Sequence, residues 1–220
     1  QAVPTTADFC EPDRWPDLDW ERLGRTHGLQ RAIFDKLVPP ADHETFESWS
    51  DATQAYQAMV VRRQVEALRR IKYRPTGGFA QFCFADGHPA VTWSVLGHDR
   101  VPKLAYDALR AACRPVIVVA DRPAERLVPG DTLELDVHVI SDLRAPVAGA
   151  VVEARVRWDG GERTWRWGGD LPADSCVRIG TVAFAVPGAP GPCTLELTCR
   201  YDDTECDNRY DARIASPADP

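Results

Sequence analysis

The sequence predicts a mixed fold in which helices and one buried strand are followed by an all-β sandwich. Up to about residue 114 the chain alternates helical and strand-like patterns. From residue 115 onward apolar and polar side chains alternate with a period of two, and turn signals containing Gly or Pro separate the alternating runs. We therefore assign residues 1–114 to one domain and residues 115–220 to a second.

The first domain is expected to contain helices over residues 19–25, 27–36, 51–72 and from near 101 to 112. The third helix is the most strongly patterned, because its apolar residues follow helical spacing on one face while arginines fall mostly on the other. Ser50 or Asp51 would cap its first turn. Pro102 suits the first turn of the last helix, where the missing N–H costs no hydrogen bond.

A strand is predicted over residues 78–84, between two of these helices. Its apolar residues form a nearly continuous run: Phe79, Phe82, Cys83 and Phe84. A run that is apolar on both faces indicates a parallel strand covered by helices. Asp86, His88 and Trp93 follow just past its carboxyl end, which is where ligands bind in α/β sheets. The segment therefore predicts the rim of a small-molecule site. A single strand cannot form a sheet, so this domain resembles the last part of a barrel whose earlier strands are missing.

The second domain carries about seven predicted strands, as an immunoglobulin-like sandwich does. They cover residues 116–120, 132–141, 150–158, 163–167, 176–186, 193–201 and 207–214. Trp165 and Trp167 share one strand face by alternation. They would form either a carbohydrate-binding platform, if exposed, or part of the core, and the core role is favoured.

Composition argues against several classes of partner. The net charge is -7 and no basic block occurs, so we expect no nucleic acid partner. No uncharged apolar run approaches about 18 residues, so we expect no membrane span. His27 and His43 lack further ligands at metal spacing, and we predict neither a metal nor another cofactor. No segment resembles a signal peptide, which predicts a cytoplasmic location without excluding secretion.

The seven cysteines are irregularly spaced and form no CxxC motif. Cys193, Cys199 and Cys206 lie close together in a region patterned as a hairpin. Cys199 and Cys206 could form a disulfide in an oxidising environment, but free thiols are favoured.

The segment GGFAQFCFADGHPAVTWS, at residues 77–94, resembles a motif of glycoside hydrolase family 2, and the β-mannosidase branch is the most similar. Those enzymes carry G-x-x-Y-W-Q-L-N-D-x-W-P-x-x-S-W-S at the last strand of a TIM barrel, and an Ig-like domain follows it. The matching residues, aligned without gaps, are Gly78, Asp86, Pro89, Trp93 and Ser94. The resemblance covers essentially the whole chain, and it implies the C-terminal fragment of a (β/α)8 TIM barrel followed by an Ig-like sandwich.

Three departures from this motif bear on the sugar site. Phe82 replaces a Trp, which keeps an aromatic face but loses the indole N–H donor. Ala85 replaces an Asn, and His88 places an imidazole where the family has an indole. The resemblance therefore implies a glycosidase more firmly than it implies specificity for mannose.

Retaining glycosidases use two carboxylic groups about 5 Å apart, a nucleophile and an acid/base. The family takes both from Glu residues on the fourth and seventh barrel strands, which the resemblance places upstream of Gln1. We therefore assign no catalytic residue to this chain. The resemblance implies substrate-binding roles for Phe82, Asp86 and His88, with Asp86 either holding a sugar hydroxyl or fixing its loop.

The leading hypothesis is the C-terminal portion of a retaining, β-mannosidase-like glycosidase that hydrolyses terminal β-glycosides. Its partners would be a β-linked carbohydrate and the remainder of the barrel, in the same chain or another. The isolated chain is expected to be inactive. Two alternatives stay open: a non-catalytic carbohydrate-binding or interaction module, and a degenerate relative that kept the scaffold but lost hydrolysis.

Overall fold

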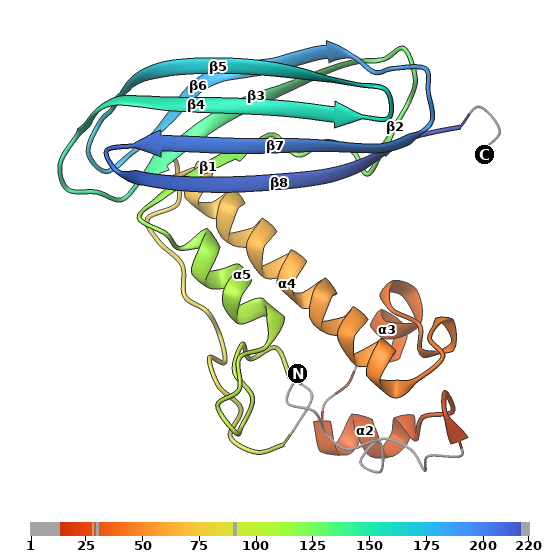
Figure 1. Ribbon diagram of the computed structural model, residues 1–220. Helices are drawn as coiled ribbons and strands as arrows, with labels where there is room; N and C mark the ends of the chain where they lie inside the picture. The colour runs from red at the N-terminus through yellow and green to blue at the C-terminus, as the bar shows by residue number, and fades with distance from the viewer. Residues whose placement is uncertain (1–13, 28, 30, 90–91, 217–220) are drawn as a thin grey trace. The chain divides into compact units, whose positions relative to one another are not determined.

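The computed structural model describes residues 14–27, 29, 31–89 and 92–216. The chain divides into two compact units (Figure 1). The helical unit comprises residues 1–67 and 79–113, and the sandwich unit comprises residues 68–78 and 114–220. The segment 68–78 is therefore part of the sandwich unit, although it lies within the first predicted domain. That domain assignment stays a prediction.

The predicted helices form with shifted bounds. They are α2 (Trp20–His27), α3 (Arg31–Leu37), α4 (Phe46–Arg70) and α5 (Leu104–Ala112), and a short 3-10 helix, η2 (Pro40–Asp42), precedes α4. Helix α4 begins at Phe46 rather than near Asp51, because Thr45 and Ser48 cap it earlier. The N–H of Ser48 donates to Thr45 Oγ1 at 3.1 Å. Within the described residues, no helix combines the length and apolar character needed to cross a membrane.

The helical unit has a small aromatic core near the start of α4. Its buried residues are Leu18, Leu23, Val38, Phe46 and Trp49. Trp49 is fully buried, and its Nε1 donates to the carbonyl of Val38 at 2.9 Å. The ring of Trp15 lies 5.8 Å from that of Trp49, and Trp15 Nε1 donates to the carbonyl of His43 at 3.0 Å. Both indoles therefore pack their rings in the core while their N–H groups stay hydrogen-bonded.

The buried strand predicted over residues 78–84 is absent from this structure. Residues 77–84 form no strand, and Phe79, Phe82 and Phe84 are all exposed. The nearest pairing is an isolated bridge between Ala85 and Leu96. A strand needs neighbours that pair its N–H and C=O groups, and the described residues offer this segment no such neighbours.

The predicted β-sandwich is confirmed. Its strands are β1 (Val116–Ala120), β2 (Arg126–Leu127), β3 (Thr132–Ser141), β4 (Val147–Trp158), β5 (Gly161–Leu171), β6 (Ser175–Ala185), β7 (Gly191–Tyr201) and β8 (Thr204–Ile214). One sheet has the order β1-β3-β6 and the other the order β2-β8-β7-β4-β5 (Figure 1). β2 is missing from the prediction because a strand of two residues carries no readable period.

The sandwich core lies between the sheets, on the apolar side of the period-two pattern. Along β4, Val152, Ala154 and Val156 are buried, and the residues between them are more exposed. Val152 pairs with Cys199 of β7, and Ala154 pairs with Leu197. Each of these cross-strand pairs therefore presents two buried side chains to the same core.

Two buried polar residues of β8 connect the sheets. The hydroxyl of Tyr210 accepts the N–H of Ala120 at 3.1 Å, and Asn208 Nδ2 donates to the carbonyl of Val118 at 3.0 Å. Ala120 and Val118 both belong to β1, one of the two edge strands of the three-stranded sheet. These bonds fix β1 against β8, and they satisfy polar groups that burial would otherwise leave unpaired.

Candidate functional site

A cavity of about 520 Å³ lies in the helical unit, lined by residues of α3, of α4 and of the loop over residues 81–93. Its wall is largely apolar and includes Ile33, Leu37, Tyr56, Val60 and Trp93. The volume falls within the range of small-molecule sites, about 300–1,000 Å³. An apolar cavity of this size suits either a ligand or apolar side chains from another part of a protein.

Asp86 lies in the wall of this cavity and forms a buried ion pair. The side chains of Asp86 and Lys103 are each 1% exposed, and Lys103 Nζ lies 2.9 Å from Asp86 Oδ2. The hydroxyl of Thr92 donates to Asp86 Oδ1, and Lys103 Nζ donates to Ser94 Oγ at 2.8 Å. A buried carboxylate and a buried ammonium each require such partners, because an unpaired charge in the interior is very costly.

These partners set the charge of Asp86. Burial would raise the pKa of the carboxyl, but hydrogen bonds from Thr92 and Ser94 and the charge of Lys103 together bring the pKa below its ordinary value of 3.8. Asp86 is therefore a carboxylate at neutral pH and has no proton to give as a general acid.

Two glutamines of α4 hold the segment that carries Asp86 and Lys103. Gln57 Nε2 donates to the carbonyl of Ser94 at 3.0 Å, and Gln54 Oε1 accepts the N–H of Leu104 at 3.3 Å. The N–H of Asp86 donates to the carbonyl of Leu96 at 3.1 Å. The loop thus has a fixed path although it contains no strand, and Asp86 contributes to that path through its side chain and its backbone.

The other two predicted substrate-binding residues, Phe82 and His88, lie outside the cavity wall. Phe82 is 76% exposed, His88 is exposed, and neither lines the cavity. Trp93 does line it while remaining 59% exposed. The structure therefore brings Asp86 and Trp93 to one cavity and leaves Phe82 and His88 on the surface of the same loop.

Lys103 is the residue of this site that the sequence analysis missed. Only Lys36, Lys72 and Lys103 are lysines, in a chain with 26 Lys and Arg residues together. Lysine is rarely buried unless it is paired. Its rarity, together with the apolar residues around position 103, is the signal that could have identified it.

The described residues of this cavity lack the groups for retaining glycoside hydrolysis, which needs two carboxylic groups about 5 Å apart. Asp86 carries the single carboxylate among the described lining residues, and Lys103 neutralises it. Across the described ranges, no group of three or more His, Cys, Asp or Glu side chains is arranged to hold a metal ion.

No model of a known protein family matches the chain. Among curated proteins, the chain is similar to fungal β-mannosidases. β-Mannosidase A of Aspergillus terreus is 32% identical over 119 residues, which cover 53% of this chain and 12% of that enzyme. β-Mannosidase A of Aspergillus niger is 32% identical over 114 residues, which cover 50% of this chain and 12% of that enzyme.

Solved structures share the fold over a larger part of the chain. A β-D-mannosidase from Dictyoglomus thermophilum matches with a TM-score of 0.63 and 19% identity, over 76% of this chain and 20% of that one. An exo-chitosanase of Amycolatopsis orientalis in complex with PNP-β-D-glucosamine matches with a TM-score of 0.65 and 17% identity, over 82% of this chain and 21% of that one.

The chain is similar to the C-terminal region of β-mannosidase-like enzymes of glycoside hydrolase family 2. It spans only about an eighth of the length of the curated relatives it matches, since the matched stretch covers 12% of them.

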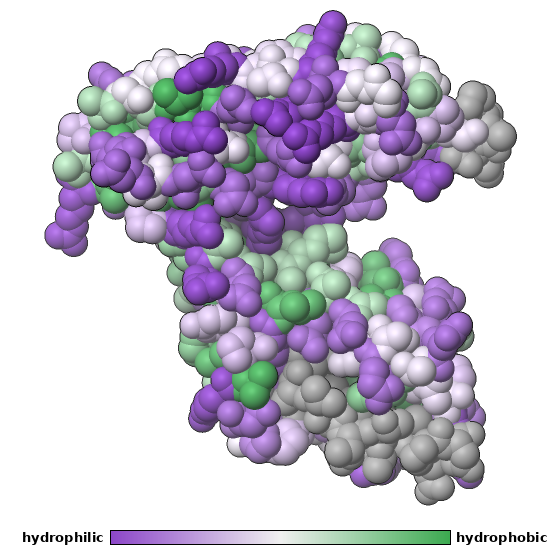
Figure 2. Space-filling view, in the orientation of Figure 1, coloured by the Kyte–Doolittle hydropathy of each residue, from purple (hydrophilic) through white to green (hydrophobic). Residues whose placement is uncertain are grey.

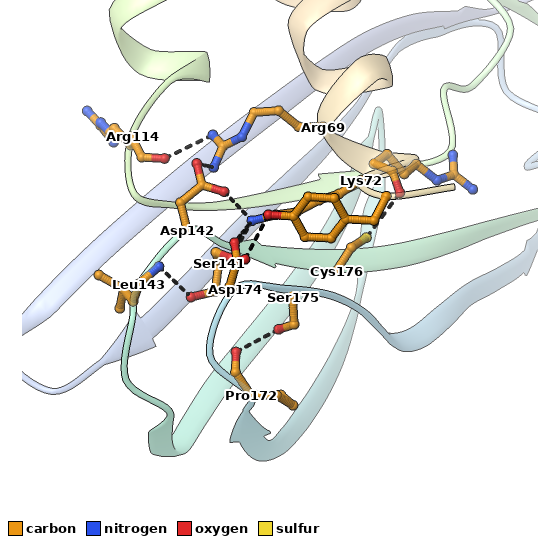
Figure 3. Close-up of polar contacts among 12 residues, drawn as sticks. Arg69, Lys72, Arg114, Ser141, Asp142, Leu143, Pro172, Asp174, Ser175 and Cys176 are labelled. Atoms are coloured by element: carbon orange, nitrogen blue, oxygen red, sulfur yellow. Dashed lines mark hydrogen bonds and ion pairs between the residues drawn. The ribbon is translucent and has the colours of Figure 1, made fainter. Parts of the chain in front are cut away.

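A second polar cluster lies within the sandwich unit, around the segment 68–78 (Figure 3). Lys72 Nζ lies 2.6 Å from Asp142 Oδ1 and 2.5 Å from Asp174 Oδ1. It also donates to the carbonyl of Ser141 at 3.0 Å, and Arg69 reaches the second oxygen of Asp142 at 2.8 Å. The ammonium and both carboxylates are thus paired within the cluster.

The partners of Lys72 keep it charged. Burial would lower the pKa of its ammonium, but hydrogen bonds and charge from Asp142 and Asp174 raise the pKa above its ordinary value of 10.5. The hydroxyl of Tyr73 also donates to Asp174 Oδ2, at 2.7 Å. The charges of this cluster already neutralise one another, which leaves none of them available for a ligand. We therefore interpret the cluster as a structural one that attaches the segment 68–78 to the ends of the sandwich strands.

Trp165 and Trp167 are engaged with the sandwich core. The ring of Trp165 lies 6.2 Å from that of Phe184. Trp167 covers Gly180 so closely that even a Cβ there would meet the indole at 2.2 Å. Both indoles are half-buried and pack on the core cluster, which disfavours the exposed carbohydrate-binding platform.

Proposed function

We propose that this chain is the C-terminal portion of a retaining, β-mannosidase-like glycosidase that hydrolyses terminal β-glycosides. The catalytic Glu pair would lie on barrel strands outside residues 1–220. The matches to β-mannosidase A and to the solved glycosidase structures support the proposal, because each covers only a fraction of a much longer enzyme.

The observation that carries the proposal is the incomplete core of the helical unit. An apolar cavity of about 520 Å³ adjoins a loop whose aromatic side chains are exposed. The exposed aromatic residues of the loop are Phe79, Phe82, Phe84 and Trp93. A free-standing domain would bury such side chains, since each contributes about 1.5–3 kcal/mol when fully removed from water.

The partner that would cover this surface is the remainder of a (β/α)8 barrel. Neighbouring strands would pair the N–H and C=O groups of residues 78–84 and allow the segment to become a strand. Side chains then alternate between two faces, so Phe82 and Phe84 would face one side and Phe79 the other. The apolar run suits that position, because barrel strands are covered on both faces.

Asp86, Phe82 and His88 would then lie at the carboxyl end of that strand, on the side where barrel enzymes bind substrate. Phe82 would offer a flat apolar ring to the C–H face of a sugar, and His88 would offer a hydrogen-bonding imidazole. Asp86 would mainly hold the loop, because Lys103 and Thr92 already occupy its oxygens.

The proposal is tested by comparing the glycosidase activity of the full-length gene product with that of residues 1–220 alone. The full-length protein should hydrolyse 4-nitrophenyl β-D-mannoside or a related aryl β-glycoside with retention of anomeric configuration. NMR of the first-formed product identifies its anomeric configuration. Residues 1–220 should show no turnover. Turnover by the short chain, or no activity of the long one on a panel of aryl β-glycosides, would falsify the proposal.

Variants of the long protein test the proposed substrate contacts. Phe82→Ala and His88→Ala should each lower kcat/KM by about tenfold or more, since each removes contacts worth over 1.4 kcal/mol in the transition state. Phe79→Ala is the matched control, because it removes an aromatic ring from the same run on the opposite strand face. Equal losses in all three variants would argue for a folding effect instead of substrate binding.

A further inference from the structure

Cys199 and Cys206 face each other across the hairpin of β7 and β8. They are direct partners in the antiparallel register, and they are 0% and 2% exposed. Directly opposed residues on antiparallel strands have Cα atoms about 4.5–5.5 Å apart. Disulfides require a Cα separation of about 4.4–6.8 Å, so the backbone already meets that requirement.

The pairing is selective among the buried cysteines of this sheet. Cys193 is also buried on the inner face of β7, but it opposes Ala212. Six residues of extended strand separate Cys193 from Cys199, which is about 20 Å. Cys193 is therefore out of reach of Cys206, and it serves as an internal control for any effect of burial alone.

The two thiols are not equivalent. A hydrogen bond with Cys206 raises the pKa of Cys199, and the same bond lowers the pKa of Cys206. This asymmetry favours Cys206 as the thiol that attacks first. The pair lies near the turn between Tyr201 and Thr204, at the end of the sandwich core, so local opening of the hairpin end would expose it.

We propose that Cys199 and Cys206 form a redox-active pair that closes to a cross-strand disulfide when a low-molecular-weight disulfide such as oxidised glutathione is present. The Cys206 thiolate attacks one sulfur of the oxidant, breaks its S–S bond and releases one glutathione thiolate. The Cys199 thiolate then attacks Cys206 Sγ and releases the second. Two protein thiols are oxidised, one glutathione disulfide is reduced to two thiols, and the two thiol protons pass to the released thiolates.

Peptide mapping of the purified chain tests whether the Cys199–Cys206 disulfide forms. The protein is reduced, freed of reductant, treated with oxidised glutathione, denatured, blocked with N-ethylmaleimide and digested with trypsin. Cleavage after Arg178, Arg200 and Arg209 yields peptides 179–200 and 201–209. A disulfide joins these peptides, and before blocking it lowers the mass of the undigested chain by about 2 Da, the loss of two hydrogens.

The variants Cys193→Ala, Cys199→Ala and Cys206→Ala assign the bond, with circular dichroism to confirm the sandwich in each. The joined peptide should form in wild type and in Cys193→Ala, and it should vanish in the other two. Three results would overturn the proposal: no joined peptide from folded wild type, a bond that needs Cys193, or a stable glutathione adduct on Cys206 without the cross-link.

Discussion

Most apolar side chains of the sandwich strands pack against one another in a single core, whereas several large apolar side chains of the helical unit face solvent. The outer face of the five-stranded sheet carries ion pairs, and hydrophilic residues dominate the visible face of the sandwich (Figure 2). Those pairs include Arg155–Glu153, Arg157–Glu162, Arg200–Glu205 and Arg209–Asp211. In the helical unit Phe82, Phe84 and Trp93 are exposed beside an apolar cavity. The sandwich strands thus bury their core within their own unit, while the helical unit leaves large apolar side chains uncovered.

The largest effect is expected from replacing the two ion-paired lysines, buried Lys103 in the helical unit and partly buried Lys72 in the sandwich unit. Lys103→Met leaves the carboxylate of Asp86 buried and unpaired, and should cost about 3–5 kcal/mol of unfolding free energy. Lys72→Met should cost less, about 1.5–3 kcal/mol, because its partners Asp142 and Asp174 are half exposed and water can replace the ammonium. Urea unfolding gives both values.

The double variant Asp86→Asn with Lys103→Met is the control for this comparison. It removes both charges and should recover much of the loss, since an uncharged pair has a smaller desolvation cost. Equal losses for Lys72→Met and Lys103→Met would show that the two ion-pair clusters are equally solvated.

The second comparison concerns apolar packing. Leu197→Ala should cost about 2–5 kcal/mol, because Leu197 is 1% exposed on a central strand of the sandwich. Ile33→Ala should stay within about 0.5 kcal/mol, because Ile33 is 47% exposed in the cavity wall and its removal leaves no new void. Thermal unfolding followed by circular dichroism measures both. A large cost at Ile33 would mean that the cavity wall is already packed.

Acid should weaken the helical unit through Asp86. Because the folded-state pKa of Asp86 lies below 3.8, the unfolded state takes up a proton first as the pH falls. The stabilisation is therefore present above that ordinary value and is lost as the pH falls through the lower folded-state value. As the pH falls below about 4, the unfolding free energy of wild type should decrease more steeply than that of Asp86→Asn. Parallel curves from urea titrations would contradict this.

The smallest effects on stability are expected at the two surfaces. Phe82→Ser and Arg200→Ala should each change the unfolding free energy by no more than about 0.5 kcal/mol. They should differ in solution behaviour, since Phe82→Ser removes exposed apolar surface while Arg200→Ala removes one member of an exposed ion pair. Sedimentation velocity should show reduced self-association only for Phe82→Ser. A shift in Arg200→Ala instead would place the contact surface on the sandwich.

The sandwich could be predicted closely because its signals are local. β3 (Thr132–Ser141) has the bounds expected from alternation and turn residues, and β1 (Val116–Ala120) has the expected bounds although all five of its residues are apolar and buried. A strand that faces water on one side and a core on the other must alternate, so its side chains report both its extent and its inner face.

The candidate site could be predicted only in part. Asp86 was identified as a residue of the ligand rim, and it does line a cavity. Its partner Lys103 was missed, because the ion pair depends on how the loop folds back on itself. Neither the buried bonds of Asn208 and Tyr210 to β1 nor the pairing of Cys199 with Cys206 follows from periodicity, since both depend on strand register.

The sequence by itself determined the two-part composition of the chain, the strands of the sandwich and the resemblance of residues 77–94 to a glycosidase motif. Only the tertiary structure shows that residues 78–84 form no strand and that Lys103 neutralises Asp86. It also shows that Cys199 and Cys206 are in register across β7 and β8. The physical reason is the same in each case. Periodicity records whether a side chain meets water or a core, whereas pairing depends on which partner the folded chain brings within reach.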